Sequence, residues 1–547
     1  MTRPEAGFDH AVSVEAPERV DRPDVEPVGT RIDEWWARML GTPGRMRLWY
    51  WGGPIAVTLL AAVLRLWRLG DPHSLVFDET FYVKDAWSLS HLGYEGTWPN
   101  GADAKFNAGD VNTYTSVGSY VAHPPLGKWL ISFGMRAFGA ENSFGWRISA
   151  AMVGILAVFV IVLIARKLFN STLLATIAGG LLAIDGHAIV LSRTSLLDNF
   201  VMIFTLLGFG AILLDRQQSA GRLALWLARR AETQRDIDWG PAIWWRPWLL
   251  TAGILFGAAT AVKWSGLYFL AAFALYSLVV DAVARRAAGV SFWASGTVFK
   301  QAPVTFLLMI PVALATYLVS WTGWFVTKGG YFRTWADEPG NAAHGLFAWV
   351  PHAVQSFVHY QVSVYNFNVN EHSPHPYAAN PFTWLFLVRP TAFYYTSQQQ
   401  GQQGCISAGG CAEYITSIAN PLLWWAATAA LFYLVYRLVR FREWRVGLIL
   451  MGIVAGYLPW LLYANRTIFQ FYAIVFEPYL ILGLVLVIGL FLGSARDPAW
   501  RRRSGILLVS TFLGLVVLVS VFFYPVWTGM QIPLWFAEAH YWWPGWR

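Results

Sequence analysis

Charged residues are scarce in this 547-residue chain, at 13% of the total. Apolar residues make up 56%, aromatic residues 16%, and the mean hydropathy is +0.43. This composition excludes a string of soluble domains and indicates a polytopic membrane protein. The net charge of +8 does not indicate a nucleic acid partner, because the basic residues form short clusters between apolar runs, as topogenic signals do.

The chain also lacks the common nucleotide-binding motifs. It has no dinucleotide fingerprint, no P-loop and no internal repeat, so ATP and nicotinamide chemistry are not supported and we expect no cofactor. Residues 1–45 contain no run that resembles the core of a cleaved signal peptide. They mix acids, Arg, Pro and Gly without apolar periodicity, which predicts a disordered cytoplasmic tail before a membrane domain over 46–547.

Long apolar runs, in contrast, are abundant. Eleven are long enough to cross about 30 Å of hydrocarbon: 48–68, 146–165, 172–190, 197–214, 247–263, 265–284, 302–322, 421–437, 446–463, 474–494 and 505–524. They predict an all-α bundle of about eleven transmembrane helices.

The short linkers between these runs predict the orientation. With the N-terminus inside, the cytoplasmic linkers carry 19 Lys and Arg, whereas the short outer linkers carry only Arg193, Lys263 and Arg466. This positive-inside asymmetry places the C-terminal tail (525–547) and two long loops, 69–145 and 323–420, on the outer face of a cell membrane. Loops of such length are usually functional.

Each outer loop carries a recognisable feature. In the first, an amphipathic helix that lies in the membrane interface is predicted by apolar residues at helical spacing, namely Leu126, Trp129, Leu130, Phe133 and Phe138. The second holds Cys405 and Cys411, which are the only cysteines and face the oxidising side. We expect a disulfide between them, and no zinc site, because zinc needs more ligands nearby than two thiols.

A group of ionisable residues lies near the outer ends of the apolar runs. Charge close to a membrane is costly unless it is paired or functional, so these residues indicate a shared polar cavity that opens outward. Adjacent carboxylates, several cations and an aromatic wall suit a sugar donor carried on a lipid phosphate. The group comprises Asp78, Glu79, Arg147, Asp185, His187, Arg193, Asp198, Lys263 and Arg466.

Several short motifs give the chain a resemblance to a known family. In chain order they are F-D-E-T-F-Y, H-P-P-L-G-K, G-W-R-I-S-A, V-K-W-S-G-L-Y, H-P-Y and R-T-I-F-Q-F-Y, which begin at Phe77, His123, Gly145, Val262, His375 and Arg466. This ordered set resembles the bacterial, actinobacterial-type protein O-mannosyltransferases of the GT-C class. The large outer loop is too short for the β-trefoil module of eukaryotic members, so this loop or other proteins must select the acceptor.

The resemblance implies transfer of mannose from polyprenyl-phosphate mannose to Ser or Thr of exported polypeptides, with inversion. It implies that Asp78 is the general base and that Glu79 orients the acceptor or the sugar. An extended dipeptide at this point would aim the two carboxylates in opposite directions. Arg147, Lys263 and Arg466 are then expected to hold the lipid phosphate.

The acceptor groove is assigned to His123, His375 and Tyr377. We expect no metal, because a base together with cations for the phosphate makes a divalent ion redundant. The bilayer and the donor lipid are the expected partners, with Ser/Thr-rich secreted polypeptides and the protein export machinery beside them. Two alternatives stay open: a GT-C transferase that moves another sugar, of arabinose type, to a glycan or lipid, and a flippase or transporter of a lipid-linked sugar.

Overall fold

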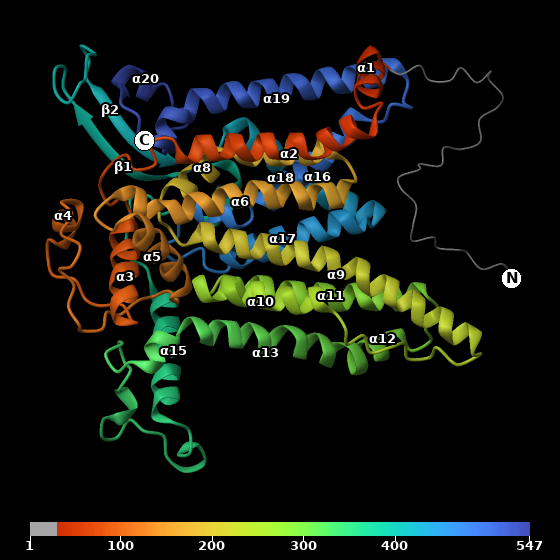
Figure 1. Cartoon of the computed structure of the whole chain (residues 1–547), viewed down its shortest axis with the longest axis horizontal. Coiled ribbons are helices and arrows are strands. Elements are labelled where there is room, and N and C mark those ends of the chain that lie inside the picture. Colours follow the sequence, from red (N-terminus) through yellow and green to blue (C-terminus); the bar gives the residue numbers. More distant parts are fainter. Residues whose placement is uncertain (1–29) are drawn as a thin grey trace.

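The computed structural model describes residues 30–547, most of which are helical (Figure 1). Every predicted apolar run is a helix, and one run is a pair of helices, so the prediction of a helical multi-span membrane protein is confirmed. These helices are α2 (Pro43–Leu66), α6 (Ser143–Phe169), α7 (Thr172–Ile184) with α8 (Gly186–Arg193), α9 (Asp198–Glu232), α10 (Pro247–Val262), α11 (Gly266–Ala287), α13 (Ala302–Ser320), α16 (Pro421–Phe441), α17 (Trp444–Leu461), α18 (Glu477–Leu492) and α19 (Ala499–Thr528).

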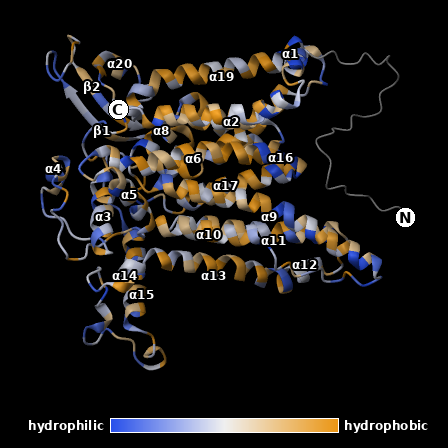
Figure 2. Cartoon of the chain, in the orientation of Figure 1, coloured by the Kyte–Doolittle hydropathy of each residue, from blue (hydrophilic) through white to orange (hydrophobic). Residues whose placement is uncertain are grey.

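The structure has fewer candidate membrane spans than the eleven predicted, because some of the apolar helices are short. Within residues 30–547, eight helices are long and apolar enough to cross a membrane, or nine if α7 and α8, which are bent by 59°, form one span. Helices α10 and α18 have 16 residues each, about 24 Å at 1.5 Å per residue, which is shorter than the hydrocarbon core. Apolar residues predominate along the helices of the bundle, and polar residues are concentrated at its two ends (Figure 2).

Both long loops and the C-terminal tail lie at one end of the bundle, which we call the loop end (69–145, 323–420 and 525–547) (Figure 1). The predicted helix forms as α5, in which Phe133 and Phe138 are exposed while Lys128 and Met135 are buried; its location in the membrane interface stays a prediction. The other elements here are α3 (Glu79–Leu92), α4 (Ala102–Asn107), α5 (Leu126–Phe138), α14 (Thr322–Val326), η2 (Trp335–Asp337), η3 (Gly345–Phe347), α15 (His352–Asn370), η4 (Pro381–Phe386), η5 (Gln470–Val475), α20 (Leu534–Glu538) and η6 (Pro544–Trp546).

A small antiparallel sheet at the loop end departs from the all-helical prediction. Its strands are β1 (Thr391–Gln398), β2 (Cys411–Ser417) and β3 (Ile532–Pro533), in the order β1-β2-β3. The third strand comes from the C-terminal tail, and local periodicity does not reveal such a distant pairing. Cys405 and Cys411 form a disulfide beside the turn between β1 and β2, where the sequence places one.

The opposite end of the bundle holds α1 (Arg31–Met39), α12 (Trp293–Gly296) and the π-helical turn η1 (Thr297–Gln301) (Figure 1). Helix α1 corrects the predicted disordered tail over 1–45, of which residues 1–29 lie outside the described part. A capping box between Thr30 and Asp33 begins this helix, and Asp33 also accepts a hydrogen bond from Arg502 of α19 at 2.8 Å. Ile32, Trp35, Trp36 and Met39 do recur at helical spacing in this short segment. Helix α1 nevertheless buries none of its residues, and a cap and an ion pair hold it.

Candidate active site

Asp78 and Glu79 lie at the start of α3, where the chain turns sharply. Phe77 has φ +48°, in the left-handed region that is uncommon for a bulky residue, and Asp78 is the N-cap. The pair is therefore a helix start and not the extended dipeptide that we expected. Successive residues of a helix still differ by about 100° in direction, so the two carboxylates face different surroundings.

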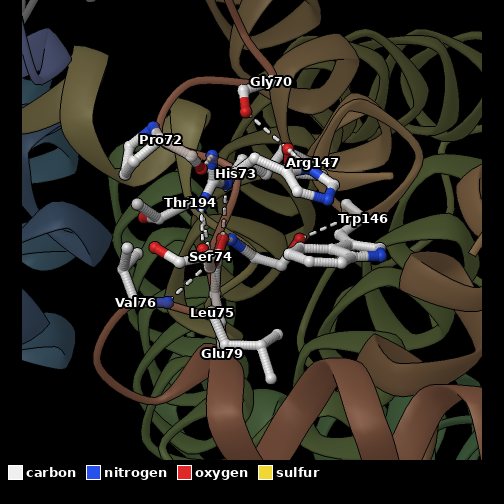
Figure 3. Close-up of polar contacts among 12 residues, drawn as sticks. Gly70, Pro72, His73, Ser74, Leu75, Val76, Glu79, Trp146, Arg147 and Thr194 are labelled. Carbon is white, nitrogen blue, oxygen red and sulfur yellow. Dashed lines mark hydrogen bonds and ion pairs between the residues drawn. The ribbon is translucent and has the colours of Figure 1, made fainter. Parts of the chain in front are cut away.

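Glu79 faces the protein interior and is fully buried. Its two oxygens accept hydrogen bonds from Nε and Nη2 of Arg147, both at 2.9 Å (Figure 3). They also accept the backbone N–H groups of Val76 at 3.1 Å and Ser195 at 2.9 Å. With four donors around it, this carboxylate has no free position for a substrate.

Arg147, at the start of α6, is also fully buried and fully used. Besides Glu79, its guanidinium donates to the backbone carbonyls of Leu69 at 3.4 Å, Pro72 at 2.9 Å and Ser74 at 2.9 Å. Figure 3 shows the chain of residues 70–76 wrapped around this group. The arrangement fixes the turn that presents Asp78, and it leaves no N–H of Arg147 for a phosphate.

Asp78 faces a different, polar cluster, and its side chain is only partly buried. The Tyr82 hydroxyl, one turn along α3, points to its carboxylate at 3.5 Å. Burial raises the pKa of Asp78 to about 6; the positive charge of Lys263 lowers it, and the negative charge of Asp198 raises it. Asp78 therefore lies within electrostatic reach of residues from α9 and α10.

Lys263, directly after α10, is the central cation of this cluster. Its ammonium donates to both oxygens of Asp198, at 2.9 and 3.1 Å. It also lies 3.8 Å from the ring centroid of Tyr472 in η5, which is a cation–π distance. Asp198 therefore balances the lysine charge and, together with Tyr472, fixes its position.

Arg466 supplies a second cation near the same cluster and is half-buried. Its Nη2 donates to the side-chain oxygen of Asn368 on α15 at 3.0 Å, and its buried Nε has no partner within residues 30–547. The charges of both Lys263 and Arg466 act on His123. Unlike Arg147, Arg466 keeps a free donor.

The three residues predicted for an acceptor groove lie on two sides of the Asp78 turn. The His123 ring is 6.1 Å from the Tyr82 ring, and burial keeps the pKa of His123 well below its usual value, so it is neutral at pH 7. His375 packs edge-on against Phe77 at 6.0 Å, and the backbone N–H of Tyr377 donates to His375 Nδ1 at 3.2 Å. His375 therefore contacts the turn directly, whereas His123 and Tyr377 reach it through Tyr82 and His375.

The remaining ionisable residues form separate contacts. Asp185 caps α8 by accepting the N–H of His187 at 2.8 Å, and the His187 ring pairs with Glu477 at 3.0 Å. Arg193 donates to the carbonyls of Arg65 and other residues at the end of α2. The nine residues predicted to share one cavity therefore divide into several clusters. Four of the nine form the polar cluster: Asp78, Asp198, Lys263 and Arg466.

The sequence did not single out three members of this cluster, Tyr82, Tyr472 and Asn368. Tyr82 follows Asp78 by four residues, so a helix beginning at position 78 would have indicated it. Tyr472 ends the motif R-T-I-F-Q-F-Y, which could have indicated it, whereas Asn368 lies in none of the motifs and carries no local signal. In the described part of the chain, no three His, Cys, Asp or Glu side chains are arranged to hold a metal ion.

Comparisons with known proteins identify the family. Residues 111–324 match the family model for dolichyl-phosphate-mannose-protein mannosyltransferase, and residues 353–546 match the C-terminal four-transmembrane region of protein-O-mannosyltransferase. The polyprenol-phosphate-mannose protein mannosyltransferase of Mycobacterium tuberculosis is 34% identical over 517 residues, 93% of each chain. That of Corynebacterium glutamicum is 31% identical over 478 residues, covering 86% of this chain and 88% of the relative.

The fold is also similar to a solved structure. A chain of the Saccharomyces cerevisiae protein O-mannosyltransferase Pmt1-Pmt2 complex, bound to the sugar donor, superposes with a TM-score of 0.67 over 95% of both chains at 15% identity. The fold is therefore of the GT-C type. The chain belongs to the polyprenol-phosphate-mannose protein mannosyltransferase family and is a membrane enzyme that transfers mannose from this lipid carrier to protein.

Proposed function

We propose that the enzyme uses a single in-line displacement with Asp78 as the general base. The acceptor hydroxyl gives its proton to Asp78 while its oxygen bonds to C1 of mannose. The bond from C1 to the phosphate oxygen breaks on the opposite face, polyprenyl phosphate leaves with the electron pair, and C1 is inverted.

One observation carries this assignment: of the two adjacent carboxylates, only Asp78 has free oxygens and faces the polar cluster. A pKa of about 6 leaves Asp78 ionised at neutral pH and more basic than an ordinary aspartate. A general base works best with a pKa near the working pH. Glu79, with four donors around it, then positions the turn and does not orient a substrate.

The donor phosphate is assigned to Lys263 and Arg466. Lys263 is held by Asp198, and Arg466 has an unused donor beside the same cluster. Two cations stabilise the negative charge that grows on the leaving phosphate. We withdraw Arg147 from this role because carbonyls and Glu79 occupy its donors, and we assign it to holding the turn.

His123, His375 and Tyr377 remain the proposed lining of the acceptor and sugar groove, since all three lie around the turn that presents Asp78. The loop end is proposed to face the outside of the cell, because the basic linkers lie at the opposite end. The acceptors are then Ser/Thr-rich polypeptides on the outer face.

The variant Asp78→Asn tests the base, because it nearly preserves size but cannot accept the proton. Transfer from polyprenyl-phosphate mannose to a Ser/Thr-rich peptide should fall by about 10²–10⁴-fold, while binding of the radiolabelled donor is retained. Undiminished transfer would refute the base assignment. A wild-type protein that moves the lipid-linked sugar across vesicles without transferring it would favour a transporter.

A matched measurement addresses the metal. Wild-type transfer should survive exhaustive chelation, since a base and two cations are in place. Activity that is lost on chelation and restored by added manganese or magnesium would contradict this expectation.

A further inference from the structure

Strand β1 is an edge of the small sheet. The order β1-β2-β3 leaves β1 with a neighbour on one side only. In Figure 1 the two long strands project beyond the bundle helices at the loop end. An edge strand presents backbone groups to which another extended chain can pair.

The pairing pattern identifies which backbone groups of β1 are free. The Leu534 N–H donates to the Gly410 carbonyl at 3.1 Å, so Gly410 faces β3. Backbone direction alternates along a strand, hence Cys411 and Glu413 face β1, opposite Gln398 and Thr396. The residues between these, Tyr395 and Ser397, therefore turn their N–H and C=O groups away from β2.

No described residue pairs with this free edge. Within residues 30–547, the backbone of Tyr395 and Ser397 has no hydrogen bond outside the β1-β2 ladder. Both residues are exposed, Tyr395 to 59%. The strand T-A-F-Y-Y-T-S-Q contains no proline, lysine or glutamate, which are the residues that usually protect an edge from pairing.

The edge is continuous with the candidate active site. The Phe393 ring of β1 stacks on the Phe77 ring at 4.8 Å and 8°, and Phe77 directly precedes Asp78. A chain paired along Tyr395 and Ser397 would therefore continue toward the proposed base. Adjacent strands are separated by about 4.8 Å, so such a chain would lie beside this aromatic stack.

A disulfide constrains the loop that joins β1 to β2. Cys411, which begins β2, faces Gln398 at the end of β1, and its disulfide to Cys405 closes the connecting loop. A preformed edge costs less ordering entropy when it binds a flexible partner. The disulfide therefore stabilises the binding-competent form of β1.

We propose that the free edge of β1 binds the acceptor polypeptide in extended form, as an added β-strand that leads a Ser or Thr to Asp78. This inference rests on the proposed function, because it requires the acceptor hydroxyl to reach Asp78. Main-chain hydrogen bonds give affinity that is independent of acceptor sequence. The edge would thus accept many polypeptides, and the site would select the hydroxyl.

The wild-type enzyme can test this with a set of 12-residue acceptor peptides, each with one serine and one N-methylated amide at a different position. Methylation removes a backbone donor, so KM should rise about tenfold at alternate positions, with little change at the positions between them. A KM that does not alternate with a period of two would overturn the proposal.

The chain offers a matched pair of variants. Ser397→Pro removes an outward N–H, which an edge strand tolerates, and should raise the KM of the 12-residue acceptor about tenfold, whereas Ser397→Ala should not. Neither variant should change kcat at saturating peptide or the KM of a blocked serine dipeptide. Equal KM values for the two variants would overturn the edge proposal, while active Asp78→Asn with intact alternation would overturn only the base.

Discussion

Two adjacent carboxylates in this protein have opposite surroundings. Glu79 is fully buried, and four donors surround its oxygens. Asp78 is half-buried, has one distant hydroxyl partner and lies near Lys263 and Asp198. A polar group with every hydrogen bond satisfied indicates a structural role, whereas a charged group with unused capacity and a perturbed pKa indicates chemistry.

The largest effect on stability should come from breaking the ion pair between Glu79 and Arg147. Glu79→Gln removes the charge that balances buried Arg147, and breaking a buried ion pair costs about 3–5 kcal/mol. We expect a large fall in the thermal unfolding temperature of the detergent-solubilised enzyme. Asp78→Asn should leave that temperature nearly unchanged or raise it.

A double variant provides the control. Glu79→Leu with Arg147→Met leaves no unpaired charge buried, so it should recover part of the lost stability. The rest stays lost, because the carbonyls of Pro72 and Ser74 and the N–H group of Ser195 lose their partners. If Glu79→Gln were as stable as wild type but inactive, Glu79 would have a catalytic role and the contrast with Asp78 would fail.

A smaller effect, on donor binding, should distinguish the cations near Asp78 from Arg147. Lys263→Met should weaken donor binding by about 10- to 100-fold, since a hydrogen bond to a charged group contributes about 1.5–3 kcal/mol. Asp198→Asn should preserve donor affinity because it leaves the ammonium in place. Donor binding is measured by competition with radiolabelled polyprenyl-phosphate mannose.

The double variant Lys263→Met with Asp198→Asn removes repulsion by an unpaired Asp198 as an explanation. It should still bind the donor at least about tenfold more weakly than wild type. Wild-type affinity in this variant would show that Lys263 does not hold the phosphate.

The pKa of Asp78 predicts a pH dependence. With a pKa of about 6, kcat/KM should fall about tenfold per pH unit below pH 6, as the base becomes protonated. Because burial raises this pKa above that of the unfolded chain, Asp78 adds stability at low pH that is lost as the pH rises through 6. Asp78→Asn should therefore gain stability over wild type at pH 7.5 and not at pH 3.5.

A profile whose acid limb lies near pH 4 would contradict the burial of Asp78. The control is Glu79→Asp, assayed at a temperature where it is folded, whose acid limb should stay near pH 6 because the limb depends on the burial of Asp78.

The sequence was sufficient for features that depend on local pattern. Apolar run length predicted the helices, and basic clusters separated the two ends of the bundle. The Asp78, Lys263 and Arg466 motifs supplied three members of the polar cluster. Patterning could not show that Glu79 and Arg147 pair across 68 residues, because an ion pair depends on three-dimensional packing. The β1 edge was hidden for the same reason, since its sheet is completed by the C-terminal tail.

The smallest effect should come from removing the Cys405–Cys411 disulfide. The bond closes a short loop outside the helix bundle, so Cys405→Ser with Cys411→Ser should leave the unfolding temperature of the bundle nearly unchanged. Loosening β1 adds an ordering cost of about 0.5–1 kcal/mol when an acceptor binds, which raises the acceptor KM about two- to fivefold. Donor affinity and kcat should not change, because this loop holds none of the three site residues. Asp198 and Tyr472 hold Lys263, Asn368 of α15 holds Arg466, and the Glu79–Arg147 turn holds Asp78. A lower kcat with unchanged KM would mean that the hairpin positions Asp78. The surroundings of Asp78 would then depend on the hairpin as well as on the Glu79–Arg147 ion pair.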